Sequence, residues 1–454
     1  MCGSSLGTDL ASQIETGPAG GVGRTLDLAD LLEVARHVAR SEEVRRTAAG
    51  FIGYGATRPG DRVLIGVDTQ TDPAITDAVA SALRELGARV DVVVAETDAD
   101  REFDDADEIR VAMRRQPWVE NPRRWEGTPW IEDLARTNGY DLLIHGKGGA
   151  IPKVSHRYEG FPWVVRDHFD GPSNLFPRPL HRLINERTWS RITDHAGSRL
   201  RLTDPEGTNL TLTILEAPLR DTTRHDYGMS PKWGHLMAHP PTPIEPNDDS
   251  TGVIAGTINH FSRPFPRIEV DVEHARMTGI RGGGAYGDAW RELEAESKDT
   301  QYPSFPAPGL FWLWELAIGT NPKISRPSNI ECLSSGGFEW ERRRAGYIHC
   351  GLGTRWRSSE EVWAGERRIL YGHLHVHLLA PTLVVEASGG DVPVIEDGRL
   401  SCYDDPEVRD LAAQFGDPDA LLHDDWVPDI PGITMPGDYE AYARNPIPWV
   451  YGRG

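Results

Sequence analysis

Residues Tyr371–Pro381, Tyr-Gly-His-Leu-His-Val-His-Leu-Leu-Ala-Pro, have the alternating pattern of a β-strand. Successive side chains of a strand point to opposite faces, so His373, His375 and His377 share one face and aliphatic side chains cover the other. Three imidazoles on one face pack poorly, and neutral imidazole is the most frequent protein ligand for zinc and iron. The stretch therefore predicts a metal site, and the alternative is a partly exposed sheet face that happens to carry histidines.

Length and composition limit the class of protein. The chain has 454 residues, which favours two domains, and its 39% apolar and 26% charged content is typical of a folded, water-soluble protein. A net charge of −21 argues against nucleic acid or an anionic membrane as the main partner. No apolar run approaches the roughly 18 residues that a membrane span needs. The four cysteines lie far apart without a Cys-x-x-Cys pair, which predicts a cytoplasmic protein and excludes a cysteine zinc site.

The N-terminal part of the chain predicts an α/β domain over residues 26–195 with an open, mostly parallel sheet, preceded by a flexible leader over residues 1–25. A strand–helix–strand pattern implies two parallel strands with a right-handed crossover. The first turn of this unit, Asp68–Pro73, has no glycine that would admit a pyrophosphate, so we reject nucleotide binding. The expected elements are a helix at Leu26–Ala49, a strand at Arg62–Val67, a helix at Ala74–Leu86 capped by Asp72-Pro73, a strand at Arg89–Val94, a helix at Trp130–Thr137 and a strand at Tyr140–His145.

The pattern changes after Gly146–Pro179, which we interpret as a crossing or linker region. A mixed α+β domain that holds the metal site is expected over residues 196–417, followed by an acidic, proline-rich C-terminal tail over residues 418–454 that covers the surface or a neighbouring subunit. The expected elements are a hairpin at Arg199–Ile214 around Asp204-Pro-Glu-Gly, strands at Gly252–Ile258, Arg267–Val272, Leu370–Leu379 and Thr382–Glu386, a turn at Arg281–Gly284 and a helix at Gly287–Glu296.

Three more residues are candidates for the site. Glu315 stands alone in the apolar run Leu310–Ile318, where a carboxylate must be paired, hydrogen-bonded or metal-bound. An arginine partner is the alternative to a metal. His349 lies in a short strand before Gly-Leu-Gly, and Glu245 lies in a proline-rich loop. By itself, His349 is more typical of a hydrogen-bonded core histidine than of a ligand.

Taken in order, these pieces resemble the thermophilic aminopeptidases (the aminopeptidase T and S type metallopeptidases) and their relatives, the 2,5-dihydroxypyridine 5,6-dioxygenases. In that superfamily a proline-rich loop carries a glutamate, matched by Glu245. An apolar run ending in Gly-x-Asn-Pro carries a glutamate in the peptidases and a histidine in the dioxygenases, matched by Glu315. A histidine before Gly-Leu-Gly is matched by His349, and a His-x-Asp pair by His373-Leu-His375. The resemblance covers roughly residues 195–390 well and the N-terminal half loosely.

Two departures from the peptidase pattern favour one metal ion over two. His375 stands where the peptidases have an aspartate, and Trp356 stands where they have a tyrosine. A carboxylate can bridge two ions, whereas a neutral imidazole offers one lone pair. The dioxygenases bind one iron through two histidines and an aspartate. The same positions here are Glu315, His373 and His375, again two histidines and one carboxylate, the facial triad of non-haem Fe(II) oxygenases.

The resemblance therefore implies a mononuclear non-haem Fe(II) oxygenase. It would act with O2 on a small, metal-chelating aromatic or amino-acid-derived substrate. His349 would act as an acid or base, or as a hydrogen-bond donor to the substrate. Glu245 would steer the substrate or accept a proton, and His377 would lie beside the ligands. Three tryptophans are candidates for the walls of the substrate pocket, with core packing as the alternative: Trp312, Trp314 and Trp356.

Two other functions stay open. The first is a zinc-type aminopeptidase or amidase with one or two ions of Zn, Co or Mn, in which Glu245 serves as base to a metal-bound water. The second is a non-catalytic, ligand-binding homologue. The resemblance also implies a homodimer.

Overall fold

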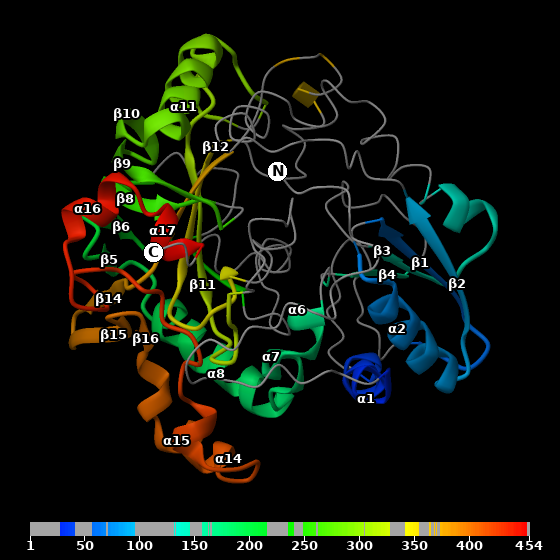
Figure 1. Ribbon diagram of the computed structural model, residues 1–454. Coiled ribbons are helices and arrows are strands. Elements are labelled where there is room, and N and C mark those ends of the chain that lie inside the picture. Colours follow the sequence, from blue (N-terminus) through cyan, green and yellow to red (C-terminus); the bar gives the residue numbers. More distant parts are fainter. Residues whose placement is uncertain are drawn as a thin grey trace.

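The protein is a mixed α/β molecule with one small parallel sheet and one large, curled antiparallel sheet (Figure 1). This computed structural model describes residues 28–40, 57–69, 71–95, 131, 133–145, 157–161, 163, 166–215, 235–239, 248–259, 262–303, 305–326, 341–353, 363–364, 367, 369 and 373–451.

The small sheet has the strand order β2-β1-β3-β4, and all of its pairs are parallel. The predicted strand–helix–strand unit is confirmed, and the side chain of Asp72 accepts a hydrogen bond from the backbone N–H of Ala74 to cap α2. Helix α1 ends at Ala39, and residues 41–49 of the predicted helix lie outside the described residues. The elements are α1 (Leu28–Ala39), β1 (Arg62–Asp68), α2 (Pro73–Glu85), β2 (Arg89–Ala95), β3 (Leu142–His145) and β4 (Arg157–Gly160), and a helical turn over residues 133–137 precedes β3.

Strand β1 is apolar from Val63 to Val67 because both of its faces are covered. Val63 and Ile65 pack with the buried faces of α1 and α2, while Leu64 packs with Ile131 and Leu143 on the other side. A central strand of a parallel sheet has this continuous apolar pattern rather than alternation.

Part of Gly146–Pro179, the predicted crossing or linker region, forms regular secondary structure. This stretch contains β4, α6 (Arg166–Asp170) and α7 (Pro172–Leu175), and it leads into the long helix α8 (Arg178–Thr193). The sequence did not reveal α8, because polar side chains are buried beside its apolar ones. His181 is buried on the same helix as Leu180 and Ile184, which belong to the core of the large sheet.

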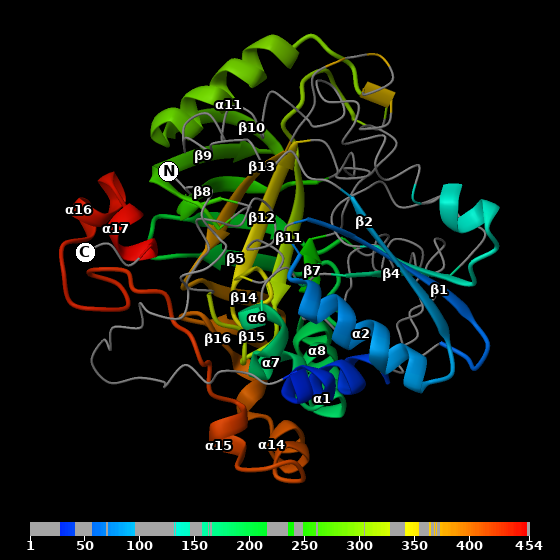
Figure 2. The ribbon, with the colours of Figure 1, turned by 45° about the vertical axis from the view of Figure 1, so that its right-hand side comes forward.

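The large sheet contains twelve strands. Ten follow the order β16-β15-β14-β5-β6-β8-β13-β12-β11-β7, and β9 and β10 extend from β8. The sheet curls, so that β11, β12 and β13 run across the direction of β8 and β9 (Figure 2). Their apolar faces meet in one core that includes Leu202, Ile254, Leu316, Cys350 and Val376.

The predicted hairpin is confirmed, with β5 and β6 antiparallel. The predicted turn at Arg281–Gly284 is the end of β10 and the start of α11, where Gly283 adopts a left-handed φ of 79° that favours glycine. The elements are β5 (Arg199–Thr203), β6 (Asn209–Thr213), β7 (His235–His239), β8 (Thr251–Ile258), β9 (Pro264–Glu273), β10 (Arg276–Gly282), α11 (Gly284–Ser297), β11 (Leu313–Gly319), β12 (Ile348–Gly353), β13 (His373–Leu378), β14 (Thr382–Ala387), β15 (Gly390–Glu396) and β16 (Arg399–Leu400).

The C-terminal segment packs onto the large sheet. Ile430, Tyr442 and Val450 form a small core with Ile258 and Tyr347. The segment contains η4 (Ser401–Asp404), α14 (Pro406–Ala412), α15 (Pro418–Leu421), α16 (Tyr439–Arg444) and α17 (Ile447–Val450). In the described part of the chain, no helix has both the length and the apolar character that crossing a membrane requires.

Candidate metal centre

The candidate centre lies on three adjacent antiparallel strands, β11, β12 and β13, with β12 in the middle. The register sets Glu315 opposite Gly351 and Gly351 opposite His375, so these residues form one row across the sheet. A second row, two residues away along β12 and β13, contains His349 and His377, which pair directly. Because side chains alternate along a strand, both rows point to the same face, opposite the apolar core.

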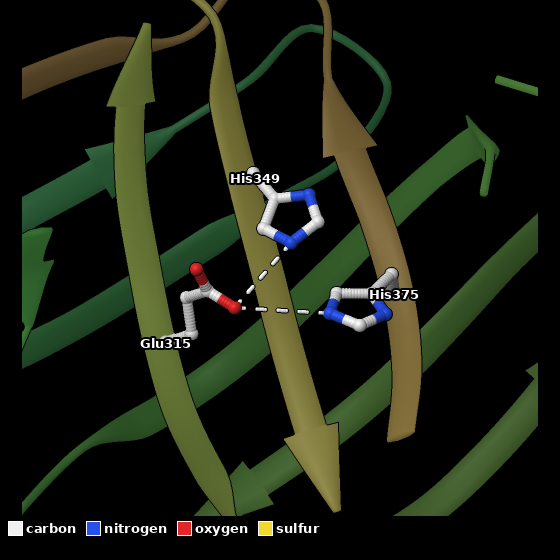
Figure 3. A group of neighbouring side chains, drawn as sticks. All are labelled: Glu315, His349 and His375. Atoms are coloured by element: carbon white, nitrogen blue, oxygen red, sulfur yellow. Dashed lines mark ion pairs between the residues drawn. The ribbon is translucent and has the colours of Figure 1, made fainter. Parts of the chain in front are cut away.

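Glu315, His349 and His375 point toward one another on this face (Figure 3). Oε2 of Glu315 lies 3.4 Å from Nε2 of His349 and 3.7 Å from Nε2 of His375. The ligand atoms of the three residues all lie within 4.8 Å of one another, and the exposed fractions are 5%, 0% and 1% in sequence order. The two imidazole rings are stacked, with centroids 4.3 Å apart.

Gly351 makes this convergence possible. It occupies the central strand directly between Glu315 and His375. A Cβ atom at this position would lie 3.1 Å from Nε2 of His375 and 3.2 Å from Oε2 of Glu315. The absent side chain thus leaves the space in which these two ligand atoms approach each other.

The spacing of the three atoms suits a single transition-metal ion. Zinc bonds to imidazole nitrogen and carboxylate oxygen are about 2.0–2.2 Å long, so two ligand atoms at a tetrahedral angle lie about 3.4 Å apart. The two separations from Glu315 are 3.4 and 3.7 Å. A buried carboxylate facing two imidazoles is also the donor set that iron and zinc both accept.

A chain of polar side chains continues behind His349. Nδ1 of His349 lies 2.7 Å from Nε2 of His377, and Nδ1 of His377 lies 3.3 Å from Oε1 of Glu341. Glu341 also accepts hydrogen bonds from Nε of Arg326, at 2.8 Å, and from the hydroxyl of Tyr347. Burial by itself would raise the pKa of Glu341, but Arg326 and these hydrogen bonds hold that pKa at about 2. Burial lowers the pKa of His377.

Two aromatic residues hold His375 in place. The hydroxyl of Tyr286, on α11, donates to the backbone oxygen of His375 at 2.8 Å and lies 3.4 Å from its backbone nitrogen. The indole of Trp314 meets the imidazole of His375 edge-on, with centroids 6.2 Å apart. Trp314 is on this side because the register of β11 shifts between Leu313 and Glu315, a bulge that frees Trp314 from simple alternation.

The structure brings together several residues that the sequence singled out. Glu315 and His375 are joined by His349, and His377 is one hydrogen bond away. Glu315 faces both histidines, with Oε2 at 3.4 Å from His349 and 3.7 Å from His375. His373 starts β13 opposite Gly353, and its side chain lies outside what the structure describes.

The other predicted site residues are distributed differently. Trp314 lies beside His375, whereas Trp312 belongs to the apolar core and packs near Phe305. Glu245 and Trp356 lie outside the described residues.

Sequence reasoning missed Glu341, Arg326 and Tyr286. Glu341 begins the stretch Glu-Arg-Arg-Arg, which is typical of a solvated charged turn, yet its side chain is completely buried. Nothing in the local pattern marks it, because its burial comes from partners that lie elsewhere in the sequence.

Comparison with models of protein families gives no match, and neither does comparison with curated protein sequences. Among solved structures, 2,5-dihydroxypyridine dioxygenase from Pseudomonas putida KT2440 is similar, with a TM-score of 0.48 and 12% identity over 84% of this chain and 99% of that chain. AmpT from Thermus thermophilus is also similar, with a TM-score of 0.45 and 11% identity over 82% of this chain and 99% of that one. These are the two kinds of enzyme that the sequence motifs resemble. At these scores, the functional argument rests on the side chains of this chain.

Proposed function

We propose that this protein is a mononuclear non-haem Fe(II) oxygenase, with the ion held by Glu315, His349 and His375. The observation that carries the proposal is the donor set: one carboxylate and two imidazoles converge on one buried point. Two histidines and one carboxylate on one side of an ion leave coordination positions open, the arrangement of non-haem Fe(II) oxygenases. His373, on the same strand as His375, stays a predicted ligand.

The composition of the cluster supports one ion rather than two. Within the described residues, Glu315 is the one carboxylate in the group. His377, which could have added a further ligand, faces His349 with one ring nitrogen and Glu341 with the other. A bridging ligand between two ions needs a carboxylate or a comparable donor, which a neutral imidazole does not replace.

When bound, the ion would supply a site for O2 and for a chelating substrate, together with the redox chemistry that joins them. The residues of the chain supply the negative charge and the donor atoms around the ion. Glu315 brings one negative charge to a buried position, which lowers the cost of placing a divalent cation there. His349 and His375 add neutral nitrogen donors, and Trp314 covers one edge of His375. We therefore propose a small, metal-chelating aromatic or amino-acid-derived substrate, as the resemblance implies.

A zinc-type hydrolase is the second candidate, because the same donor set favours it. Two histidines and a glutamate also form catalytic zinc sites in which water takes the fourth position. In that case Zn, Co or Mn would activate the water, and Glu245 would be the proposed base.

One experiment separates the candidates. The protein is purified, its metal content is measured, and the metal-free form is reconstituted anaerobically with Fe(II) before O2 is added. One iron per chain with oxygen uptake supports the oxygenase. Two zinc ions per chain, with release of a chromophore from a leucyl substrate, would refute it in favour of the aminopeptidase. If the wild-type protein binds no metal tightly, the result would favour the non-catalytic, ligand-binding homologue. Size-exclusion chromatography with light scattering tests the proposed homodimer.

A further inference from the structure

We propose that Glu341 is a positioning residue: its carboxylate fixes the tautomers of His377 and His349, so that Nε2 of His349 presents a lone pair to the metal position. The proposal rests on the proposed function, because it assigns His349 to the metal. The proposal adds two residues to the site, His377 and Glu341. His377 contacts His349, and Glu341 acts through His377.

The chain of tautomers starts at Glu341. An ionised carboxylate only accepts hydrogen bonds. Glu341 is held in that state by the guanidinium of Arg326, 2.8 Å from Oε2, and by the hydroxyl of Tyr347. Nδ1 of His377 lies 3.3 Å from Oε1 of Glu341, so this nitrogen must carry the proton.

The next step follows from the chemistry of imidazole. A neutral ring protonated on Nδ1 has its lone pair on Nε2, and complete burial favours the neutral ring. Nε2 of His377 therefore accepts, and Nδ1 of His349, 2.7 Å away, must donate. The lone pair of His349 is then on Nε2.

This outcome places two acceptors opposite each other. Nε2 of His349 faces Oε2 of Glu315 at 3.4 Å. A metal ion between these atoms would stabilise the arrangement by accepting both lone pairs. A fixed tautomer also avoids displacing a proton from Nε2 when the ion binds. A hydrogen-bonded partner on the far nitrogen of a metal-binding histidine serves this purpose in metal sites generally.

The test is the substitution Glu341→Gln, which keeps the size of the side chain. It reverses the direction of the hydrogen bonds that run from residue 341 through His377 to His349. The amide oxygen is expected to face Arg326, so the amide N–H groups face His377 and donate to Nδ1. His377 then carries its proton on Nε2, and His349 carries its proton on Nε2 as well, where the metal should bind. We expect the affinity for Zn²⁺ or Co²⁺ to fall roughly 10–100-fold.

Two measurements read this out separately. Nitrogen-15 NMR of the metal-free protein, labelled at histidine, reports which ring nitrogen carries the proton. Isothermal titration with Zn²⁺ reports the affinity. The wild type should show a protonated Nδ1 in His349 and Glu341→Gln a protonated Nε2, while Glu341→Asp, which keeps the carboxylate, should retain the wild-type tautomer. Asp405→Asn is the matched control, because Asp405 is also a carboxylate paired with an arginine, Arg191, at 2.7 Å.

The outcomes distinguish this inference from the proposed function. If the wild type has the expected tautomers but binds no metal, the proposed function is overturned and the proposed series of tautomers is supported. If the wild type binds metal but carries a protonated Nε2 in His349 when metal-free, the proposed series of tautomers is overturned. This result holds even if Glu341→Gln does not fold. Equal affinity and equal tautomers in wild type and Glu341→Gln also overturn it. A loss of affinity in Asp405→Asn as large as that in Glu341→Gln would show a general effect on stability and overturn the specific role of Glu341.

Discussion

Replacing Gly351 by alanine should weaken metal binding while leaving the fold intact. Gly351 has no positive φ, so alanine can adopt its backbone conformation without strain. The new methyl carbon would lie 3.1 Å from Nε2 of His375 and 3.2 Å from Oε2 of Glu315. Both distances are shorter than nearly all Cβ contacts in proteins, so the two ligand atoms must move by a few tenths of an ångström.

The expected loss follows from this displacement. Metal–ligand distances in functional sites stay within about 0.2 Å of their preferred values, so the shift exceeds what the coordination tolerates. Packing one methylene too many into a filled site typically costs about 1–3 kcal/mol. If the bound state bears most of this cost, the affinity falls roughly 5- to 150-fold, since about 1.4 kcal/mol corresponds to a factor of ten.

The assay is isothermal titration of metal-free protein with Zn²⁺ and, under anaerobic conditions, with Fe(II). Gly389→Ala is the matched control, because this glycine lies in an exposed turn, has no positive φ, and a Cβ atom there meets nothing within 4 Å. Circular dichroism of both metal-free variants checks the fold. The reasoning is refuted if Gly351→Ala is folded and binds either metal as tightly as Gly389→Ala.

Three further predictions concern single residues. Glu315→Gln should lower metal affinity on the order of 100-fold or more, because the ion loses its one charged ligand in the described group; metal content after dialysis measures this, and unchanged content would contradict it. Tyr286→Phe removes the donor to the buried backbone oxygen of His375 and should cost about 1–3 kcal/mol in urea unfolding, with an unchanged midpoint as the contrary result. Burial lowers the pKa of His181 from 6.5 to about 4. The unfolded chain therefore binds this proton first, and stability should fall on the order of 3 kcal/mol as the pH drops from about 6.5 to 4. His181→Gln should flatten that part of the unfolding profile, and an unchanged slope would count against it.

Local pattern was enough to predict much of the fold. The unit β1–α2–β2 and the hairpin β5–β6 follow from apolar periodicity and turn residues within about 30 residues of one another. In each case the partner strand is close in sequence, so pairing needs no knowledge of the rest of the chain.

Elements whose partners are remote were harder to predict. Helix α8 buries His181 through a contact with Thr320, 3.1 Å away, so its polar residues hid its inner face. Trp314 points to the site because a bulge interrupts the alternation of β11, and a bulge leaves no mark in the sequence of one strand. Glu341 is buried against partners that include His377, 36 residues further along the chain.

The candidate site extends across the sheet, which explains why the three histidines of β13 indicated its place but not its full membership. Alternate residues of one strand lie about 6.6–6.8 Å apart along it, too far for three of them to share one ion. Directly opposed residues on neighbouring strands lie about 4.5–5.5 Å apart. Glu315 and His375 are two strands apart and meet because Gly351 offers no side chain between them, and His349 joins from the same strand as that glycine. The residue that makes the group compact is therefore Gly351, which has no donor atom in its side chain and which only the register of three strands places between an acid and a histidine.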